Sequence, residues 1–322
     1  HWRWGLAFLA NCTPARTRVN LETVLRLALY NRRQLESVQA ETGIRFDHHR
    51  TGILHLYRNR RSFDGAAEKA SLLNDLGCRC EILDEAGCVA REPALAASAG
   101  SLAGGILSPD DACGDAHLFT QGLARISAEL GVEFRYGEEI RRIRVAGGRV
   151  AAIETASGPI TGDAFVVAAG SYTPLLLKPL GVRLPIYPTK GYSVTLPTEG
   201  RAGAPTVSLT DDDYKLVYSR LGERLRIAGM AEFGGYDQRL DPARARIILE
   251  RALALFPACG DGEAAEFWTG LRPLTPDGAP IIGAVGYPNL FVNSGHGTHG
   301  WTLCCGSGRL LADLVDGRTP EI

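Results

Sequence analysis

The sequence predicts a mixed α/β fold in which two kinds of sheet alternate along the chain. Residues 164–169, AFVVAA, form a continuous apolar run, which is typical of a strand buried on both faces of a parallel sheet. Residues 214–233 instead alternate between apolar and polar positions around a Leu-Gly turn, which predicts an antiparallel hairpin. Because elements of both kinds follow one another, we expect two discontinuous, interleaved domains.

The composition is that of a globular chain. Of its 322 residues 45% are hydrophobic and 22% are charged, and the net charge is −1, which argues against disorder and against a nucleic-acid partner. Eight cysteines occur without a CxxC pair, so we expect reduced thiols in a cytoplasmic protein and no metal site. The sequence has no run of about 18 apolar residues, so we expect no transmembrane helix.

The first half of the chain predicts helices that end at glycines. Apolar residues from Leu21 to Val38 follow helical spacing, with Asn20 as the expected N-cap and Gly43 as the C-terminal stop. Residues 52–59 alternate like a strand. Residues 64–77 predict a second helix, closed by Gly77, and residues 118–132 predict a third.

The second half begins with a β-meander. Three strand-like runs lie between residues 138 and 170, with turns at Gly147-Gly148 and Gly158-Pro159, and the last run ends at Gly170. Residues 184–197 predict a strand that precedes the hairpin of residues 214–233. A helix is expected at residues 242–257, and residues 289–315 predict a strand, a glycine loop and a helix.

The glycine loop allows two interpretations. Gly295, Gly297 and Gly300 precede a helix whose first N–H groups are free donors, so a planar cofactor could lie against the backbone here. Alternatively, the loop is only a tight turn between strand and helix. His296 and His299 bracket Gly297; with no carboxylate nearby they are a weak metal signal, and a proton-handling or cofactor-contact role is the other interpretation.

Arg272 lies in the segment WTGLRPLTPDGAPIIG, residues 268–283, just before a proline-rich turn. An arginine fork matches a carboxylate in two-point geometry, so Arg272 could hold an amino-acid or hydroxy-acid substrate. The competing interpretation is a structural ion pair with an Asp or Glu. Tyr192 and Tyr214 fall on predicted strands, where most tyrosines are packing residues with a satisfied hydroxyl.

Several segments in order carry a resemblance to a known family: WRWGLAFLANC, GGILSPDDACGDAHLFTQGLA, VVAAGSYTPLLL, YPTKGYSVTLP, FWTGLRPLTPDGAPIIG and NSGHGTHGWTLCCGSGR. Together they resemble the family of FAD-dependent D-amino-acid and glycine oxidases, and within it the D-amino-acid dehydrogenase small subunits. The resemblance covers essentially the whole chain. It implies an FAD-binding domain interleaved with a mostly antiparallel substrate-binding sheet.

The resemblance also implies an activity. A family member removes a hydride from the α-carbon of a D-amino acid, and the imino acid then hydrolyses to a 2-oxo acid and ammonia. Electrons would pass to a quinone or another respiratory acceptor, so the protein could lie at the inner membrane as a peripheral protein. Arg272 matches the arginine of the family's GLRP motif and would clamp the substrate carboxylate.

Other residues are carried over by the same resemblance. Tyr192, Tyr214 and His296 are expected to line the catalytic pocket with Arg272. The segment that resembles the one beside the flavin ring and its ribityl chain comprises Gly295, His296, Gly297, Gly300, Trp301 and Thr302. Ala169 and Gly170 resemble the strand end near the adenosine half of FAD.

The chain departs from the family pattern at its start. The family opens with a βαβ unit whose G-x-G-x-x-G loop seats the FAD pyrophosphate, and no such motif precedes residue 100. We therefore expect a member truncated at its N-terminus, in which the Rossmann-like FAD-binding domain (1–45, 105–182 and 269–322) lacks its first βαβ unit. Residues 46–104 and 183–268 would form the substrate-binding domain. His299 stands where the family has an apolar residue.

Two alternatives to D-amino-acid oxidation stay open. The chain could be a related flavin amine oxidase or dehydrogenase for glycine, proline, sarcosine or an opine. It could instead be an inactive fragment that needs a second polypeptide to supply the nucleotide-binding unit.

Overall fold

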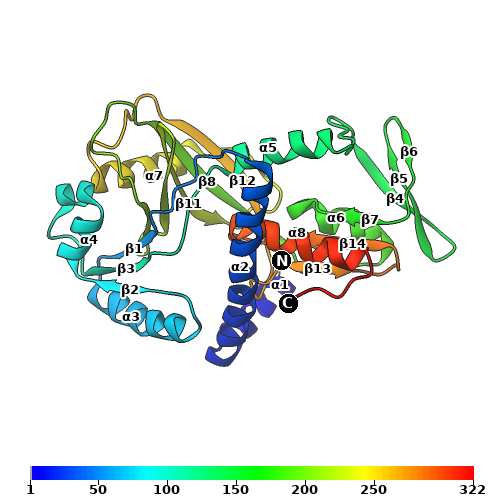
Figure 1. The fold of residues 1–322 in the computed structure, drawn as a ribbon, viewed down its shortest axis with the longest axis horizontal. Helices are drawn as coiled ribbons and strands as arrows, with labels where there is room; N and C mark the ends of the chain where they lie inside the picture. Colours follow the sequence, from blue (N-terminus) through cyan, green and yellow to red (C-terminus); the bar gives the residue numbers. More distant parts are fainter. Residues whose placement is uncertain (1) are drawn as a thin grey trace.

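The computed structural model describes residues 2–322 and contains one large sheet and two small ones (Figure 1). The large sheet has the strand order β12-β8-β11-β10-β9-β1-β3-β2. All neighbouring pairs are antiparallel except β1 with β9. Its strands are β1 (Ile53–Tyr57), β2 (Glu81–Leu83), β3 (Gly104–Ser108), β8 (Tyr187–Pro197), β9 (Ser208–Asp211), β10 (Leu216–Leu221), β11 (Arg224–Glu232) and β12 (Glu266–Leu274).

The two small sheets lie in the other half of the molecule (Figure 1). One has the order β13-β14-β7, built from β13 (Ile281–Ala284), β14 (Leu290–Ser294) and β7 (Phe165–Val167). The other is a meander of β4 (Ile140–Ala146), β5 (Arg149–Thr155) and β6 (Gly158–Ile160). The mixed α/β class predicted from the sequence is therefore confirmed.

Eight α-helices occur in the described chain, with 3₁₀ turns at Pro93–Ser98, Gly170–Tyr172 and Lys178–Leu180. The helices are α1 (Trp2–Asn11), α2 (Pro14–Thr42), α3 (Arg60–Asp75), α4 (Glu85–Arg91), α5 (Ala116–Glu129), α6 (Thr173–Leu177), α7 (Pro242–Leu255) and α8 (Gly300–Val315). None of the described helices is long and apolar enough to cross a bilayer.

The long helix α2 begins earlier than its apolar pattern predicts. Thr13 is its N-cap and accepts a hydrogen bond from the Arg16 N–H, while Pro14 occupies the first turn, where its missing N–H costs nothing. The expected N-cap at Asn20 was therefore wrong, because a capping threonine followed by proline starts the helix about two turns upstream. The stop at Gly43 is confirmed, with φ at 65°.

The apolar run of residues 164–169 also differs from what its sequence predicts. The parallel pairing that the sequence predicted is confirmed, and the partner is β14, but β7 spans only three residues and is the edge strand of its sheet. Val166 is 43% exposed, so the expectation of burial on both faces was wrong for this residue. An apolar sequence cannot show whether a strand is central or at an edge.

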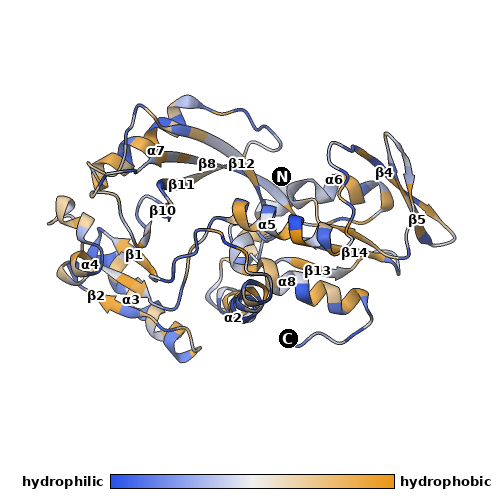
Figure 2. Ribbon diagram, turned by 45° about the horizontal axis from the view of Figure 1, so that its top comes forward, coloured by the Kyte–Doolittle hydropathy of each residue, from blue (hydrophilic) through white to orange (hydrophobic). Residues whose placement is uncertain are grey.

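Packing follows the predicted patterns elsewhere. The hairpin β10–β11 turns at Gly222, and α7 buries Ala245, Ile248, Ala252 and Leu255 in the core of the large sheet. Apolar and polar residues alternate along α7 and α8 (Figure 2). Helices α2 and α8 cross closely at Gly306, whose N–H donates to the buried Asn31 side chain over 2.9 Å. This crossing fixes the position of α8, whose first turn follows the glycine loop.

Candidate active site

Strand β8 separates two faces of the large sheet. Because side chains alternate along a strand, Thr189, Gly191 and Ser193 point to one face, and Lys190 and Tyr192 point to the other. The face with Gly191 also carries Arg272, and we call it the arginine face. The opposite face packs on α7, and we call it the α7 face.

Arg272 extends across β8 on the arginine face. It starts on β12, opposite Thr189, and its guanidinium lies directly over Gly191, where any Cβ atom would overlap it. Its Nη1 donates to the Met230 carbonyl over 2.7 Å and its Nη2 to the Gly229 carbonyl over 3.3 Å. The side chain therefore spans three strands, and it can do so only because residue 191 is glycine.

An irregularity in β11 supplies the two carbonyl acceptors. The register between β8 and β11 shifts between Gly229 and Glu232, and Met230 has a positive φ of 59°. A β-bulge of this kind locally breaks the ladder and re-aims backbone groups. Here it leaves the Gly229 and Met230 carbonyls free to hold the guanidinium.

Arg272 has no carboxylate partner in residues 2–322. Its two bonds to carbonyls leave three of five N–H donors for other acceptors, and burial, together with the neighbouring Arg226, lowers its pKa. Arg226 lies on the same face, stacks on the Trp268 ring at 5.4 Å and donates to Ser193 Oγ over 3.4 Å. The interpretation of Arg272 as half of a structural ion pair is therefore wrong, and the arginine face presents two cations to an anion.

The glycine loop after β14 is joined to the strand that carries Arg272. His296 forms a β-bridge with Leu274, and the Gly297 N–H donates to the Pro273 carbonyl over 2.9 Å. The His296 ring faces Ser307 Oγ at 3.1 Å, and burial lowers its pKa. The loop thus connects the Arg272 strand directly to the start of α8.

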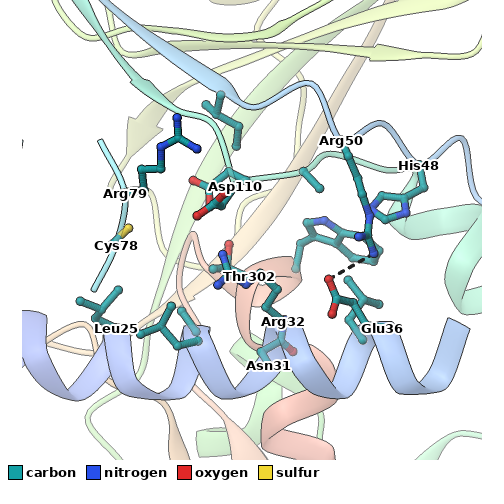
Figure 3. Close-up of a pocket in the computed structure, with 17 residues that line it drawn as sticks. Leu25, Asn31, Arg32, Glu36, His48, Arg50, Cys78, Arg79, Asp110 and Thr302 are labelled. Atoms are coloured by element: carbon teal, nitrogen blue, oxygen red, sulfur yellow. Dashed lines mark ion pairs between the residues drawn. The ribbon is translucent and has the colours of Figure 1, made fainter. Parts of the chain in front are cut away.

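The first turn of α8 lines a cavity of about 270 Å³ (Figure 3). Trp301 and Thr302 form part of its wall, and Arg32 and Glu36 reach in from α2 opposite Asp110. The N-cap residue of α8, His299, makes no side-chain capping bond, so the first-turn N–H groups are not capped by a side chain. Burial also lowers the pKa of His299.

Ala169 and Gly170 lie at the end of β7, next to the end of β14. Ser294 Oγ donates to the Gly170 carbonyl over 2.9 Å, and a Cβ atom at Gly170 would meet nothing within 4 Å. The following turn reaches the Arg272 strand through Ser171 Oγ, which lies 3.4 Å from the Leu271 carbonyl. The predicted cofactor residues at 169–170 and 295–302 therefore belong to neighbouring strand ends.

The structure does not bring the two predicted pocket tyrosines to Arg272. Tyr192 is 1% exposed on the α7 face, and its hydroxyl donates to Glu232 over 2.6 Å. Tyr214 lies in the turn before β10, where its ring stacks against Arg58 and against Arg251 of α7. Both placements correct the expectation that these rings line the pocket beside Arg272.

Sequence reasoning missed the residues that share the arginine face with Arg272. Gly191 and Gly270 are register partners, and they make a flat floor under the Arg272 guanidinium and the Trp268 ring. Trp268 is 58% exposed beside this floor. A signal was present, since KGY and TGL each place a glycine inside a strand, where it often marks a close approach.

Comparison with known proteins assigns the chain to a family. Residues 6–314 match the family model described as FAD dependent oxidoreductase, and the chain belongs to this family. D-amino acid dehydrogenases of Paramagnetospirillum magneticum and Methylobacterium nodulans are 53% and 51% identical over 321 residues. These alignments cover 100% and 99% of this chain, and 76% of each relative. The crystal structure of glycine oxidase from Geobacillus kaustophilus is similar, with a TM-score of 0.81, 26% identity, and coverage of 92% of this chain and 79% of that one.

FAD is the cofactor of this family, and the geometry of the α8 end fits part of it. Gly300 has open space where a Cβ would stand, with only the His296 Cβ at 3.9 Å, and the uncapped N–H groups beside it suit electron-rich ring atoms. Gly170 offers similar open backbone at the end of β7. These two places could hold the flavin ring and the adenosine half, respectively.

Proposed function

We propose that this chain catalyses the FAD-dependent oxidative deamination of D-amino acids to 2-oxo acids and ammonia, with Arg272 as the carboxylate clamp. The observation that carries the proposal is the partly buried guanidinium of Arg272, fixed over Gly191 without a carboxylate from residues 2–322. The D-amino acid dehydrogenases at about 50% identity support the choice of substrate class.

The proposed roles follow from donors and distances. The remaining N–H groups of Arg272 would bind both oxygens of the substrate carboxylate, and a bidentate pair fixes orientation as well as position. The Trp268 ring would form a wall beside the α-substituent, because it lies next to the guanidinium on the same floor. FAD, when bound, supplies the hydride acceptor.

The α8 end would orient the cofactor. We propose that Gly295, His296, Gly297, Gly300, Trp301 and Thr302 lie along the flavin, and that Ala169 and Gly170 contact its adenosine half. His296, with its lowered pKa, would stay neutral near pH 7 and could not add a positive charge beside the ring. Because His296 in this loop forms a β-bridge with Leu274, the flavin ring and Arg272 would keep fixed positions relative to each other.

The test is an anaerobic visible spectrum of the purified chain with added FAD, before and after D-alanine. Bleaching of a bound-flavin band by D-alanine but not by L-alanine would support the proposal, and Arg272→Lys should slow it strongly. Bound flavin without bleaching by any D-amino acid would contradict the substrate class. If no flavin binds, the activity requires a further segment, in the same chain or in a second polypeptide.

A second candidate is oxidation of glycine or an N-substituted amino acid. The likeness to glycine oxidase favours it, because the carboxylate clamp serves either substrate equally. A substrate panel of D-alanine, glycine, sarcosine and D-proline separates the two functions. A higher kcat/KM for glycine or sarcosine than for D-alanine would favour the second candidate.

We further propose which residues bind FAD, which bind the amino acid, and where in the cell the protein acts. Residues 1–45, 105–182 and 269–322 would bind FAD, and residues 46–104 and 183–268 would bind the amino acid. The electron acceptor would be a quinone or another respiratory carrier, reached from the cytoplasmic side of a membrane. Helix α1 supports a peripheral attachment, because Trp2, Leu6 and Leu9 are exposed on it, and flotation of the protein with liposomes tests this.

A further inference from the structure

The bulge that holds Arg272 is itself held from the opposite side of the sheet. Glu232, the last residue of β11, is the register partner of Lys190, and its side chain points to the α7 face. Glu232 Oε1 accepts from Lys190 Nζ over 3.0 Å, and Oε2 accepts from the Tyr192 hydroxyl over 2.6 Å. One carboxylate thus ties the end of the bulge to two residues of β8.

Lys190 and Tyr192 are buried in this network, and Glu232 is partly exposed at its edge. Lys190 is 2% exposed, and its ammonium also donates to the Arg239 carbonyl over 3.0 Å, which fixes the segment that follows the bulge. Arg244 of α7 approaches Glu232 Oε2 at 3.7 Å. A buried ammonium without a partner would be costly, so the contacts of Lys190 with Glu232 and with the Arg239 carbonyl favour this one geometry.

Glu232 and Arg272 act on the same short segment from opposite faces. Met230, whose carbonyl receives Arg272 Nη1, is two residues from Glu232, and the register shift lies between Gly229 and Glu232. Without the anchor at Glu232, β11 could return to a regular ladder in which the Gly229 and Met230 carbonyls no longer point at the guanidinium. The anchor therefore sets the position of Arg272 over Gly191.

We propose that Glu232, held by Lys190 and Tyr192, is a positioning residue for Arg272 and so determines how tightly the site binds the carboxylate end of its substrate. The proposal rests on the proposed function, in which Arg272 is the carboxylate clamp. It assigns Tyr192 a supporting role behind the sheet. In this proposal the substrate contacts none of Glu232, Lys190 and Tyr192.

The test compares Tyr192→Phe and Glu232→Gln with the control Tyr218→Phe. Tyr218 is buried in the same core on the α7 face, but its hydroxyl has no hydrogen-bond partner among the described residues. Steady-state kinetics use D-alanine and its amide, which lacks the carboxylate. Calorimetric titration with D-lactate measures carboxylate binding independently of turnover.

We expect Tyr192→Phe to raise the KM for D-alanine and the Kd for D-lactate about tenfold, with kcat within about twofold, as loss of one hydrogen bond to a charged group predicts. Glu232→Gln should act in the same direction and more strongly. The KM for D-alaninamide, and all constants of Tyr218→Phe, should stay near wild type. Tyr192→Phe keeps the test valid if Glu232→Gln does not fold.

Two results would overturn the inference. Equal effects on D-alanine and its amide, or wild-type D-lactate binding in Tyr192→Phe, would show that the network only stabilises the core. In those cases wild-type turnover of D-alanine still supports the proposed function. If the wild-type chain with FAD neither binds D-lactate nor oxidises D-alanine, the proposed function fails and the inference falls with it.

Discussion

The two faces of the large sheet differ in how their polar groups are satisfied. On the α7 face, Lys190, Tyr192 and Glu232 satisfy one another within a packed core. On the arginine face, Arg272 and Arg226 lie side by side, Asp115 acts on Arg226 only from a distance, and neither arginine forms an ion pair within the described chain. Like-charged neighbours repel, so this arrangement costs stability unless an anion joins it.

Strand β8 contributes residues to both the arginine face and the α7 face. Alternation along β8 sends adjacent residues to opposite faces, so the support at Lys190 and Tyr192 is separated from the site by a single backbone layer. The arginine face gives up stability for binding, as functional sites commonly do. The α7 face supplies the rigidity that holds the site in place.

The largest effect on either face should come from substitution of Arg272. Arg272→Lys keeps the charge but loses the planar fork, so kcat/KM for D-alanine should fall about 100- to 1,000-fold, as for a truncated buried charge pair. Steady-state kinetics with FAD-loaded protein measure this. A loss below about threefold would show that Arg272 is not the clamp.

The second-largest effect should come from Gly191, which lies under the Arg272 guanidinium. In Gly191→Ala the added methyl overlaps the Arg272 guanidinium and must displace it, so we expect KM to rise about 10- to 100-fold, equivalent to the cost of overpacking a tight site. Gly65→Ala in α3, where a Cβ meets nothing within 4 Å, is the matched control. An unchanged KM in Gly191→Ala would show that the guanidinium need not cross β8.

The apolar core of the α7 face should contribute more to stability than exposed positions on the arginine face. Ile227→Val removes one methylene from a fully buried side chain and should lower the free energy of unfolding by about 0.5–1.5 kcal/mol. Val217→Ala, at a 42% exposed position on the arginine face, should cost less than about 0.5 kcal/mol. Urea unfolding of both variants checks the difference, and the reverse order would contradict the assignment of the faces.

The smallest expected effect concerns Asp212, at the far end of the arginine face. Burial raises its pKa, but hydrogen bonds from His55 and Lys215 outweigh burial and hold the pKa at about 2. A lowered pKa stabilises the fold above the ordinary value near 4, and this stability is lost as the pH falls toward 2.

Asp212→Asn should therefore lower the free energy of unfolding at pH 6 by about 1 kcal/mol, allowing for the partial exposure of the pair. The difference from wild type should disappear near pH 2. Chemical unfolding at both pH values measures it. A difference that persists at pH 2 would show that Asp212 contributes by packing and not by charge.

Much of the local structure could be predicted because its causes are local. Gly43 ends α2 and Gly222 turns the β10–β11 hairpin through their own positive φ angles, and such positions are visible in a sequence. Arg272 and the loop from Gly295 to Gly300 could be singled out for the same reason, since their residue types stand at fixed offsets from turns. The start of α2 was missed only because the apolar pattern outweighed the Thr13-Pro14 signal.

The roles of the tyrosines could not be predicted in this way. Tyr192 and Gly191 are adjacent, and no local rule says which of the two faces the site. That choice depends on Arg272, which lies about 80 residues after Gly191 in the chain. It also depends on the bulge at Met230, whose carbonyl accepts from Arg272 although the two residues are 42 positions apart. Edge strands raise the same difficulty, as the exposed Val166 shows.

The sequence by itself determined the mixed α/β class, most helix and strand positions and the glycine loop, and it singled out Arg272 as the candidate clamp. These depend on backbone preferences and on residue spacing, which act over a few positions. Tertiary structure alone decided which face of β8 carries Arg272 and that Gly191 makes room for its guanidinium. It also decided that Tyr192 supports the bulge from behind. Such contacts join three strands distant in sequence, and only packing brings their side chains to one place.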